Sequence, residues 1–436
     1  MHDDRFAEVN GARLDVFGPG DRVAVLLPLP LAGPYDYLVG ADQEFMPGDI
    51  VDVPLGNRRA TGVVWGPATG EVDSKKLREI HGPRDAPPLP GALVKLVDWV
   101  ARYTLYPQGA VLRMALSVPD ALDPPKPQTA YTLAHDAPDV RATKARERVI
   151  AFLKDNPPLP AADIAREAGC GASVVKGLAD AGVLASVKIE PESDWPEPDP
   201  DREGVTLSDV QSAAAADLCD GVGQGFGVTL IDGVPGSGKT EVYFEAVARA
   251  LSSGKQVLVM LPEIALGAQW LARFEARFGS EPAMWHSELT AAKRRDTWRA
   301  VAEGKARVVV GARSALFLPF HDLGLIVVDE EHDGSFKQED GVVYHARDMA
   351  VVRAQLEDIP AVLVSATPSL ESVTNVRRGR YREVTLPARH GGADLADVSV
   401  VDMRKDGPAR GHWLSPMLAE ALAETFEAGD QAMLFL

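Results

Sequence analysis

Three features of the sequence predict a multidomain protein that combines a small β-rich domain, a helical domain and an α/β domain built on a parallel sheet. Short apolar runs separated by Gly and Pro lie within residues 23–66, and helical patterns lie within residues 143–190. From residue 225 onward, apolar runs alternate with helical stretches, which is typical of a parallel sheet. The 436 residues suffice for roughly three domains of about 150 residues each.

The composition excludes several classes of protein. Apolar residues make up 46% of the chain and charged residues 25%, which excludes a disordered chain. Cys170 and Cys219 are too few and too far apart for a disulfide framework, a zinc cluster or an iron–sulfur site, so we expect a reducing, cytoplasmic location. The N-terminus predicts neither a signal peptide nor a membrane span. A formal charge of −18 means that any DNA contact must come from local basic or dipolar sites.

Two proline clusters, at residues 123–128 and 191–201, set the expected domain boundaries. The second cluster is also acidic, as is typical of a solvated linker. The expected division is an N-terminal extension (1–22), a β-rich domain (23–122), a helical domain (127–190), a linker (191–203), an α/β domain (204–390) and the beginning of a further lobe (391–436).

The β-rich domain is expected to consist of four short strands followed by a helix. The strands are predicted at residues 23–29, 35–40, 49–55 and 60–66, with the GNRR segment between the last two as a hairpin tip. Apolar residues then recur at positions i, i+3, i+4 and i+7, which predicts an amphipathic helix over 91–103. These residues are Leu93, Leu96, Val97 and Val100.

Residues 143–190 have the pattern of a winged-helix domain: helical segments, a Gly-Cys-Gly turn and a short terminal strand. The helix that would enter the major groove offers only Lys176 as a cation, whereas readers of bases usually present several Arg, Asn or Gln side chains. We therefore favour a spacer or a protein contact over a reader of bases.

A phosphate-binding loop begins at residue 233, after a β-branched run that ends at Ile231 and before an amphipathic helical pattern. The segment fits G-x-x-x-x-G-K-[ST], whose glycines let backbone N–H groups point at phosphate oxygens. Lys239 is expected to bridge the β- and γ-phosphates, and Thr240 to bind Mg²⁺. The alternative, a chance glycine turn, is disfavoured by the context. The loop residues are Gly233, Pro235, Gly236, Ser237, Gly238, Lys239 and Thr240.

Further buried strands are predicted at residues 256–262, 306–313, 323–332 and 359–368, and each ends in polar or small residues. Ligands of parallel sheets bind at the carboxyl ends of the strands. Asp329 leaves one strand end where a carboxylate can hold Mg²⁺, and Glu330 follows where it can polarise a water molecule. Without the phosphate loop, two adjacent acids are more simply a solvated turn.

These motifs, taken in order, resemble those of superfamily 2 helicases and specifically the PriA family of bacterial replication restart helicases. The resemblance rests on residues 233–243, 261–266, 286–289, 311–320, 329–354 and 365–372. It implies a RecA-like helicase lobe at 204–390, ATP and Mg²⁺ as cofactors, and Gln211 as the residue that recognises adenine. It further implies an ATP-dependent 3′ to 5′ DNA helicase that recognises stalled or repaired forks and initiates primosome assembly. Residues His332, Ser365, Ala366 and Thr367 would couple the γ-phosphate to the grip on the DNA strand.

The resemblance also implies two sets of DNA contacts. The β-rich domain is similar to a domain that binds the 3′ end of a nascent strand, and the winged helix to one that helps bind duplex arms of the fork. Without the resemblance, Tyr35 and Asp36 are a strand aromatic and a turn acid. Val342 and Val343 stand where some relatives carry an aromatic and a basic residue, which predicts weaker stacking on bases. The implied DNA-contacting residues are Tyr35, Asp36, Gly56, Arg78, Phe336, Lys337, Tyr344 and Arg347.

The resemblance implies further partners and further parts of the chain. Fork DNA with a 3′ end, single-stranded DNA, primosome proteins, single-strand-binding protein and a helicase loader are the implied partners. The family continues past the apolar strand expected at 432–436 into a zinc-binding region and a second lobe, so we expect this chain to be an N-terminal portion with weak ATP hydrolysis and no Zn²⁺ ligands. Two alternatives stay open: a noncatalytic module that binds fork DNA or a partner, and a translocase of another superfamily 2 branch.

Overall fold

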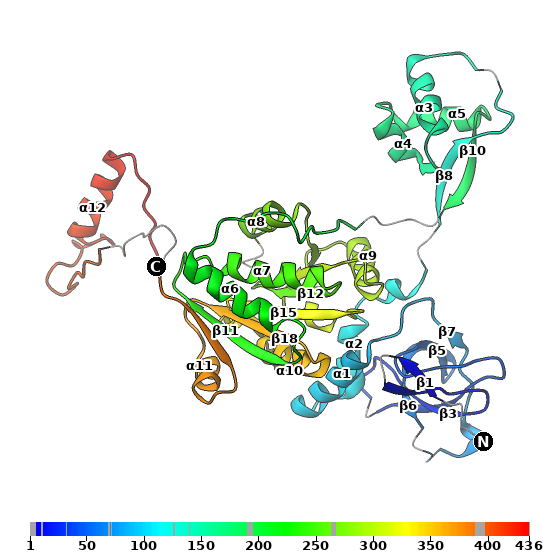
Figure 1. Cartoon of the computed structure of the whole chain (residues 1–436), viewed down its shortest axis with the longest axis horizontal. Helices are drawn as coiled ribbons and strands as arrows, with labels where there is room; N and C mark the ends of the chain where they lie inside the picture. Colours follow the sequence, from blue (N-terminus) through cyan, green and yellow to red (C-terminus); the bar gives the residue numbers. More distant parts are fainter. Residues whose placement is uncertain are drawn as a thin grey trace. The chain divides into compact units, whose positions relative to one another are not determined.

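The computed structural model describes residues 6–9, 12–31, 33–68, 70, 72–124, 127–138, 140–189, 195–262, 267–388 and 397–435. The chain separates into two compact units, Met1–Ala388 and Arg389–Leu436 (Figure 1). Among the described residues, no helix combines the length and the apolar character needed to cross a bilayer.

The N-terminal part contains a five-stranded antiparallel sheet in the order β4-β3-β6-β5-β7, beside a separate hairpin of β1 and β2. In the five-stranded sheet, Leu55 pairs with Arg58 across the turn, and Gly56 has a φ of 61°, which glycine adopts without strain. The predicted strands and the hairpin tip are therefore confirmed. The strands are β1 Phe6–Val9, β2 Ala12–Asp15, β3 Arg22–Leu26, β4 Tyr35–Leu38, β5 Ile50–Leu55, β6 Arg58–Pro67 and β7 Gly82–Pro83.

Two helices, α1 (Gly91–Thr104) and α2 (Gln108–Ala115), follow this sheet and join its core to that of the α/β domain. The four apolar residues that predicted α1 are all fully buried. The indole Nε1 of Trp298, a buried residue of the α/β domain, donates a hydrogen bond to the Ala115 carbonyl at 2.9 Å. Sequence periodicity showed the apolar face of α1, and the structure shows that this face packs partly against α10.

Residues 128–189 form three helices and a small antiparallel sheet in the order β10-β8-β9. The helices bury Val149, Ile164, Val175 and Leu178 in a core of their own. The predicted helices are confirmed, whereas the assignment to the winged-helix class stays a prediction. The elements are β8 Gln128–Leu133, α3 Lys144–Lys154, β9 Leu159–Pro160, α4 Ala161–Glu167, α5 Ala172–Asp180 and β10 Leu184–Ile189.

The α/β domain is built on a seven-stranded parallel sheet in the order β13-β14-β12-β15-β18-β11-β19. All five predicted strands are present, and the edge strands β13 and β19 are additional. The strands are β11 Gly227–Gly233, β12 Gln256–Met260, β13 Ala283–Trp285, β14 Val308–Gly311, β15 Leu323–Asp329, β18 Pro360–Ser365 and β19 Arg382–Leu386.

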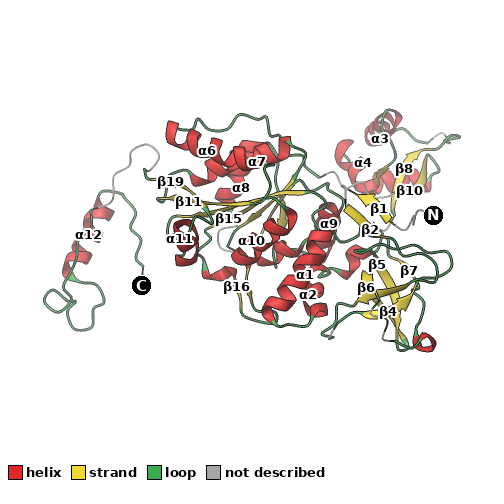
Figure 2. Cartoon of the chain, turned by 60° about the horizontal axis from the view of Figure 1, so that its bottom comes forward, coloured by secondary structure: helices red, strands yellow, loops and turns green. Residues whose placement is uncertain are grey.

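Helices cover both faces of this sheet (Figure 2). Alternate residues of β12 enter two different cores: Val257 and Val259 pack with α6 to α8, and Leu258 and Met260 pack with α9 and α10. This burial on both faces explains why the strands are continuous apolar runs. The helices are α6 Asp209–Gly221, α7 Lys239–Ser252, α8 Ala268–Phe278, α9 Ala291–Ala302, α10 Ala346–Glu357 and α11 Leu370–Arg377.

The second unit contains α12 (Pro416–Glu427), which Ser415 caps at its N-terminus. Every described residue of α12 is at least partly accessible to solvent. The strand expected at 432–436 is wrong for residues 432–435, which form no ladder, and Leu436 lies outside the described residues. Met433 and Phe435 are highly exposed because no strand among the described residues pairs with this segment.

Arg299→Ala should destabilise the folded chain by about 2–4 kcal/mol, because one guanidinium nitrogen donates to three carbonyl groups of the preceding domain. These bonds reach Asp85 at 2.9 Å, Ala121 at 3.0 Å and Asp123 at 2.7 Å. Urea unfolding measures the change. Arg295→Ala on the same helix removes two hydrogen bonds to the neighbouring, partly exposed Asp296 and should change stability by less than about 0.5 kcal/mol. Equal effects of the two substitutions would contradict the structural role of Arg299.

Candidate functional site

The phosphate-binding loop lies between the end of β11 and the start of α7, as the sequence predicted. Gly236 and Gly238 have φ values of 79° and 80°, which side-chain-bearing residues rarely adopt. A Cβ on Gly233 would lie 2.7 Å from the Ser237 hydroxyl. The glycines are therefore required by the path of the loop, which curls around the N-terminus of α7.

The loop contains polar groups suited to an anion. Lys239 Nζ donates to the Gly233 carbonyl at 2.8 Å, so the ammonium group is held against the loop. The Ser237 hydroxyl is buried and has no hydrogen-bond partner among the described residues. An unpartnered buried hydroxyl, a lysine and a helix N-terminus together fit a nucleotide phosphate.

Asp329 lies at the end of β15, where its carboxylate is held by hydrogen bonds to both oxygens. Tyr243 Oη donates to Oδ2 at 2.9 Å, and the Glu330 backbone N–H donates to Oδ1 at 2.9 Å. Burial raises the pKa of the Asp329 carboxyl to about 6, although the Tyr243 hydrogen bond and the positive charge of Lys239 both lower it. The Tyr243 hydrogen bond joins Asp329 to α7, the helix that follows the phosphate loop, so the loop and the predicted Mg²⁺ ligand lie at one edge of the sheet.

Glu330 differs from its neighbours because its side chain is accessible, with 41% of its surface exposed. Its backbone has a φ of 50°, a left-handed conformation that is uncommon for non-glycine residues and occurs at functional sites. The exposed carboxylate can contact water, as the proposed role in polarising water requires. Asp329 and Glu330 thus have different environments despite being adjacent.

The residues predicted to couple the nucleotide to DNA lie together at the ends of β15 and β18. His332 Nδ1 and Ser365 Oγ are 2.8 Å apart, and the Thr367 backbone N–H donates to Ser365 Oγ at 2.9 Å. Ala366 lies between Ser365 and Thr367 in the chain. The geometry shows a direct link between the strand ends, whereas the coupling role stays a prediction.

Sequence reasoning missed Glu331, which is fully buried beside Glu330. Its carboxylate accepts hydrogen bonds from the Ser369 backbone N–H at 2.7 Å, the Ser369 hydroxyl at 2.9 Å and the Ser372 hydroxyl at 3.1 Å. Arg347 Nη1 adds an ion pair at 3.0 Å. Glu330 and Glu331 lie beyond the end of β15, so the alternation of the strand gives no signal for the burial of Glu331.

The loop after Asp333 buries three of the residues predicted to contact DNA. Phe336 and Tyr344 are almost completely buried, and Tyr344 packs edge-on against Phe317 at 5.5 Å between ring centroids. Arg347 is bound to Glu331 and to Asp348. These three side chains hold the loop against the lobe in this structure, and their contact with DNA stays a prediction.

The same loop contains a short hairpin of β16 (Lys337–Gln338) and β17 (Tyr344–His345). Lys337 is exposed and pairs with Glu339 at 3.2 Å. Val343 is about half exposed. Of the four residues predicted here to contact DNA, Lys337 alone presents its side chain to solvent.

Gln211 is buried and already engaged by the protein. It completes a capping box with Ser208 at the start of α6, and its Nε2 donates to the Ser237 carbonyl at 2.8 Å. Its side chain therefore braces the phosphate loop directly. Recognition of adenine by Gln211 stays a prediction.

Three of the four residues predicted to bind a DNA 3′ end lie around the buried Tyr37 of β4. Tyr35 and Arg78 both act electrostatically on the Tyr37 hydroxyl, and Arg78 Nη1 donates to the Gly56 carbonyl at 2.9 Å. Asp36 points to the other face of β4, since side chains alternate along a strand, and accepts from the Gly70 backbone N–H at 3.3 Å. The structure thus gathers Tyr35, Gly56 and Arg78 and separates Asp36 from them.

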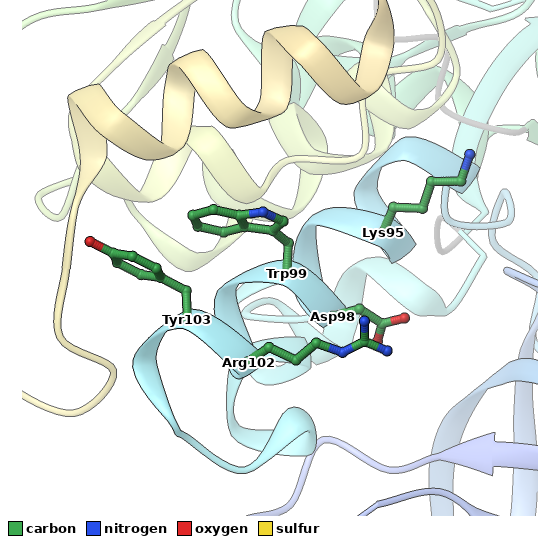
Figure 3. Close-up of a pocket in the computed structure, with 5 residues that line it drawn as sticks. All are labelled: Lys95, Asp98, Trp99, Arg102 and Tyr103. Carbon is green, nitrogen blue, oxygen red and sulfur yellow. The ribbon is translucent and has the colours of Figure 1, made fainter.

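A pocket of about 560 Å³ lies on α1, away from these predicted residues. Figure 3 shows the five side chains that line it, all of which project from this helix. The rings of Trp99 and Tyr103 stack with centroids 4.9 Å apart. Aromatic rings beside cations suit an apolar group that carries negative charge. The lining residues are Lys95, Asp98, Trp99, Arg102 and Tyr103.

The fold and the site define the class of protein. A parallel sheet with a phosphate loop after one strand and paired acids after another is typical of the nucleotide-binding lobe of superfamily 2 helicases. The sequence model of the DEAD/DEAH box helicase family matches residues 208–376. The model of the PriA 3′ DNA-binding domain matches residues 24–117.

Within that class, the chain resembles the N-terminal portion of replication restart protein PriA. It is 35% identical over 416 residues to PriA of Rickettsia conorii, covering 94% of this chain and 53% of that protein. It is 35% identical over 434 residues to PriA of Haemophilus influenzae, covering 95% and 58%, and 37% identical over 306 residues to PriA of Bacillus subtilis, covering 68% and 38%. The chain thus spans about half the length of the first two relatives.

Asp329→Asn should change how stability depends on pH. The folded-state pKa of about 6 exceeds the unfolded value of about 3.9, so the native state retains a proton between these values that the unfolded state releases. Stability of the wild type therefore falls as pH rises from about 4 to 6, by roughly 3 kcal/mol from this one group. The asparagine variant should lack this loss.

Urea unfolding of both proteins between pH 4 and 7, with EDTA present, measures the difference. Asp296→Asn changes an aspartate whose side chain is about half exposed and serves as the control. A wild type and an Asp329→Asn variant with parallel pH profiles would show that burial does not perturb this carboxyl.

Proposed function

We propose that this chain is the nucleotide-binding and DNA-end-binding part of an ATP-dependent 3′ to 5′ DNA helicase, which recognises stalled or repaired replication forks and initiates primosome assembly. The observation that carries the proposal is the meeting of Lys239 and Asp329 at one edge of the parallel sheet. The match to a PriA 3′ DNA-binding domain in the same chain supports DNA as the substrate.

In this proposal each residue of the site has a separate task. The loop N–H groups and Lys239 bind the phosphates of ATP, and Thr240 and Asp329 hold Mg²⁺. The cation supplies charge stabilisation for the phosphoryl group that is transferred. Glu330, which is exposed, orients and polarises the attacking water. His332 transmits the change through its contact with Ser365.

We propose that the isolated chain binds ATP but hydrolyses it slowly. In superfamily 2 motors a second lobe supplies arginines that stabilise the transition state. Such an arginine raises the rate of hydrolysis about 10³–10⁵-fold in related P-loop systems. No second RecA-like sheet is present among the described residues. Zinc belongs to the proposal for longer relatives. The described part of this chain contains no group of three or more candidate metal ligands.

The proposed DNA site is the surface around Tyr35, Gly56 and Arg78. Asp36 lies on the opposite face of β4, where its carboxylate accepts from the Gly70 backbone N–H. Gly56 lies at a hairpin tip where nothing lies within 4 Å of an added Cβ, so a strand end can approach the backbone closely. Residues 128–189 are proposed to be a winged helix that contacts duplex arms. Primosome proteins, single-strand-binding protein and a helicase loader are the proposed partners, in a cytoplasmic location, and the aromatic pocket on α1 is a surface suited to protein contact.

A noncatalytic scaffold that binds fork DNA is the second candidate function. The burial of Phe336 and Tyr344 favours it, because a motor is expected to present residues that sense the strand. DNA-stimulated ATP turnover by the native gene product distinguishes the two candidates.

Lys239→Ala should weaken nucleotide binding at least tenfold, because it removes the cation aimed at the β- and γ-phosphates. Titration with a fluorescent ATP analogue in Mg²⁺ measures the affinity. Lys255→Ala, which removes an exposed pair with Asp322 at the other end of α7, is the matched control and should bind like the wild type. Equal affinities for all three proteins would overturn the phosphate-loop assignment.

Binding to a fork with a free 3′ hydroxyl should exceed binding to the same fork with a 3′ phosphate, because a shaped pocket recognises the end. Few phosphates are neutralised in such a pocket, so the salt slope should be shallow, on the order of −1.5 to −2. Asp36→Lys should reduce the preference for the free end although it makes the protein less acidic.

Anisotropy titrations of both forks with both proteins measure this preference. Glu44→Lys makes the same charge change at an exposed position and is the control. An Asp36→Lys protein that binds every fork more tightly and keeps its end preference would point to a general electrostatic surface instead.

A further inference from the structure

We propose that Tyr243 is a positioning residue that orients the proposed Mg²⁺ ligand Asp329 for nucleotide binding. The inference rests on the proposed function and adds to it a residue that the motifs do not assign. Tyr243 lies on α7, three residues after Thr240, and is fully buried. Residues at i and i+3 share one face of a helix, so both side chains face the end of β15.

The hydrogen bonds fix the direction in which the Tyr243 hydroxyl donates. Trp270 Nε1 lies 2.7 Å from the Tyr243 oxygen, and an indole N–H can only donate. The tyrosine oxygen therefore accepts from Trp270, and its single proton goes to Asp329 Oδ2 at 2.9 Å. This series of hydrogen-bond donors runs from Trp270 on α8 through Tyr243 on α7 to Asp329 at the end of β15.

Asp329 is thereby held at both oxygens while lone pairs stay available for a cation. The Glu330 N–H occupies one lone pair of Oδ1, and Tyr243 occupies one of Oδ2. One buried phenol thus contacts a residue that is proposed to bind Mg²⁺. Groups that orient metal ligands in this way commonly change metal affinity 10–100-fold.

Packing alone does not account for a tyrosine at this position. The adjacent aromatic cluster of Phe244, Phe274 and Phe278 packs without polar atoms, with ring centroids 4.6–5.8 Å apart. A buried hydroxyl is costly unless it is hydrogen-bonded, and here it has partners on both sides. The hydroxyl therefore has a polar role that phenylalanine cannot supply.

Tyr243→Phe tests the inference through the Mg²⁺ dependence of nucleotide binding by this chain. Fluorescent ATP analogue binding is titrated with Mg²⁺ and repeated in EDTA. We expect the Mg²⁺ concentration at half-maximal binding to rise 10–100-fold, with affinity in EDTA changed less than twofold. Tyr106→Phe makes the same change at a partly exposed residue after α1 and should match the wild type.

Two variants of Trp270 separate positioning from general damage. Trp270→Phe removes the donor that fixes the hydroxyl and should raise the Mg²⁺ requirement less than Tyr243→Phe does. The double variant, Tyr243→Phe with Trp270→Phe, should equal Tyr243→Phe, because Trp270 acts through the hydroxyl. Circular dichroism checks folding, and Trp270→Phe remains a test if Tyr243→Phe is unfolded.

The outcomes are distinguishable. A wild-type chain that binds no nucleotide in Mg²⁺ overturns the proposed function together with the inference. A wild type that binds normally and a Tyr243→Phe variant with the same Mg²⁺ dependence overturns the inference alone. Equal losses of nucleotide affinity in Mg²⁺ and in EDTA would show a structural defect caused by packing. Recovery of the wild-type Mg²⁺ dependence in the double variant would show that Tyr243→Phe acts by leaving the Trp270 indole unpaired.

Discussion

Parallel pairing of β11, β18 and β15 is the constraint on which the candidate site depends. Asp232 of β11 lies opposite Ser365 of β18, and Val364 of β18 lies opposite Asp329 of β15. Because parallel strands end at the same edge of the sheet, segments more than a hundred residues apart deliver their polar residues to one place. The phosphate loop, the paired acids and the serine that contacts His332 are far apart in the sequence, and the strand ends bring them together there.

The three consecutive acids at the end of β15 show how one strand serves several purposes. Asp329 is buried and oriented toward the phosphate loop, Glu330 is exposed, and Glu331 is buried in a network with Arg347 and Ser369. A buried carboxylate requires a cation and hydrogen bonds, and losing one partner is strongly destabilising. This requirement draws Arg347 inward and fixes the start of α10 beside the strand end.

The β-rich domain and the α/β domain share a hydrophobic core through α1 and α2. Arg299 joins them further, since its guanidinium binds carbonyl groups of residues 85, 121 and 123. Separating the two domains would expose apolar surface and break charged hydrogen bonds. In the proposed helicase, binding of a DNA end and binding of nucleotide would then occur on one connected body.

The sequence by itself determined the elements whose patterns are local: the antiparallel strands, the apolar face of α1, the buried strands and the phosphate loop with its glycines. It also placed Asp329 and Glu330 at a strand end, because they directly follow the apolar run of a buried strand. Tertiary structure decided which side chains are accessible. The burial of Phe336, Tyr344 and Arg347, the network of Glu331 and the contacts of Tyr243 with Trp270 and Asp329 depend on segments distant in the chain, and a local pattern of aromatic and charged residues cannot show which partner will cover them.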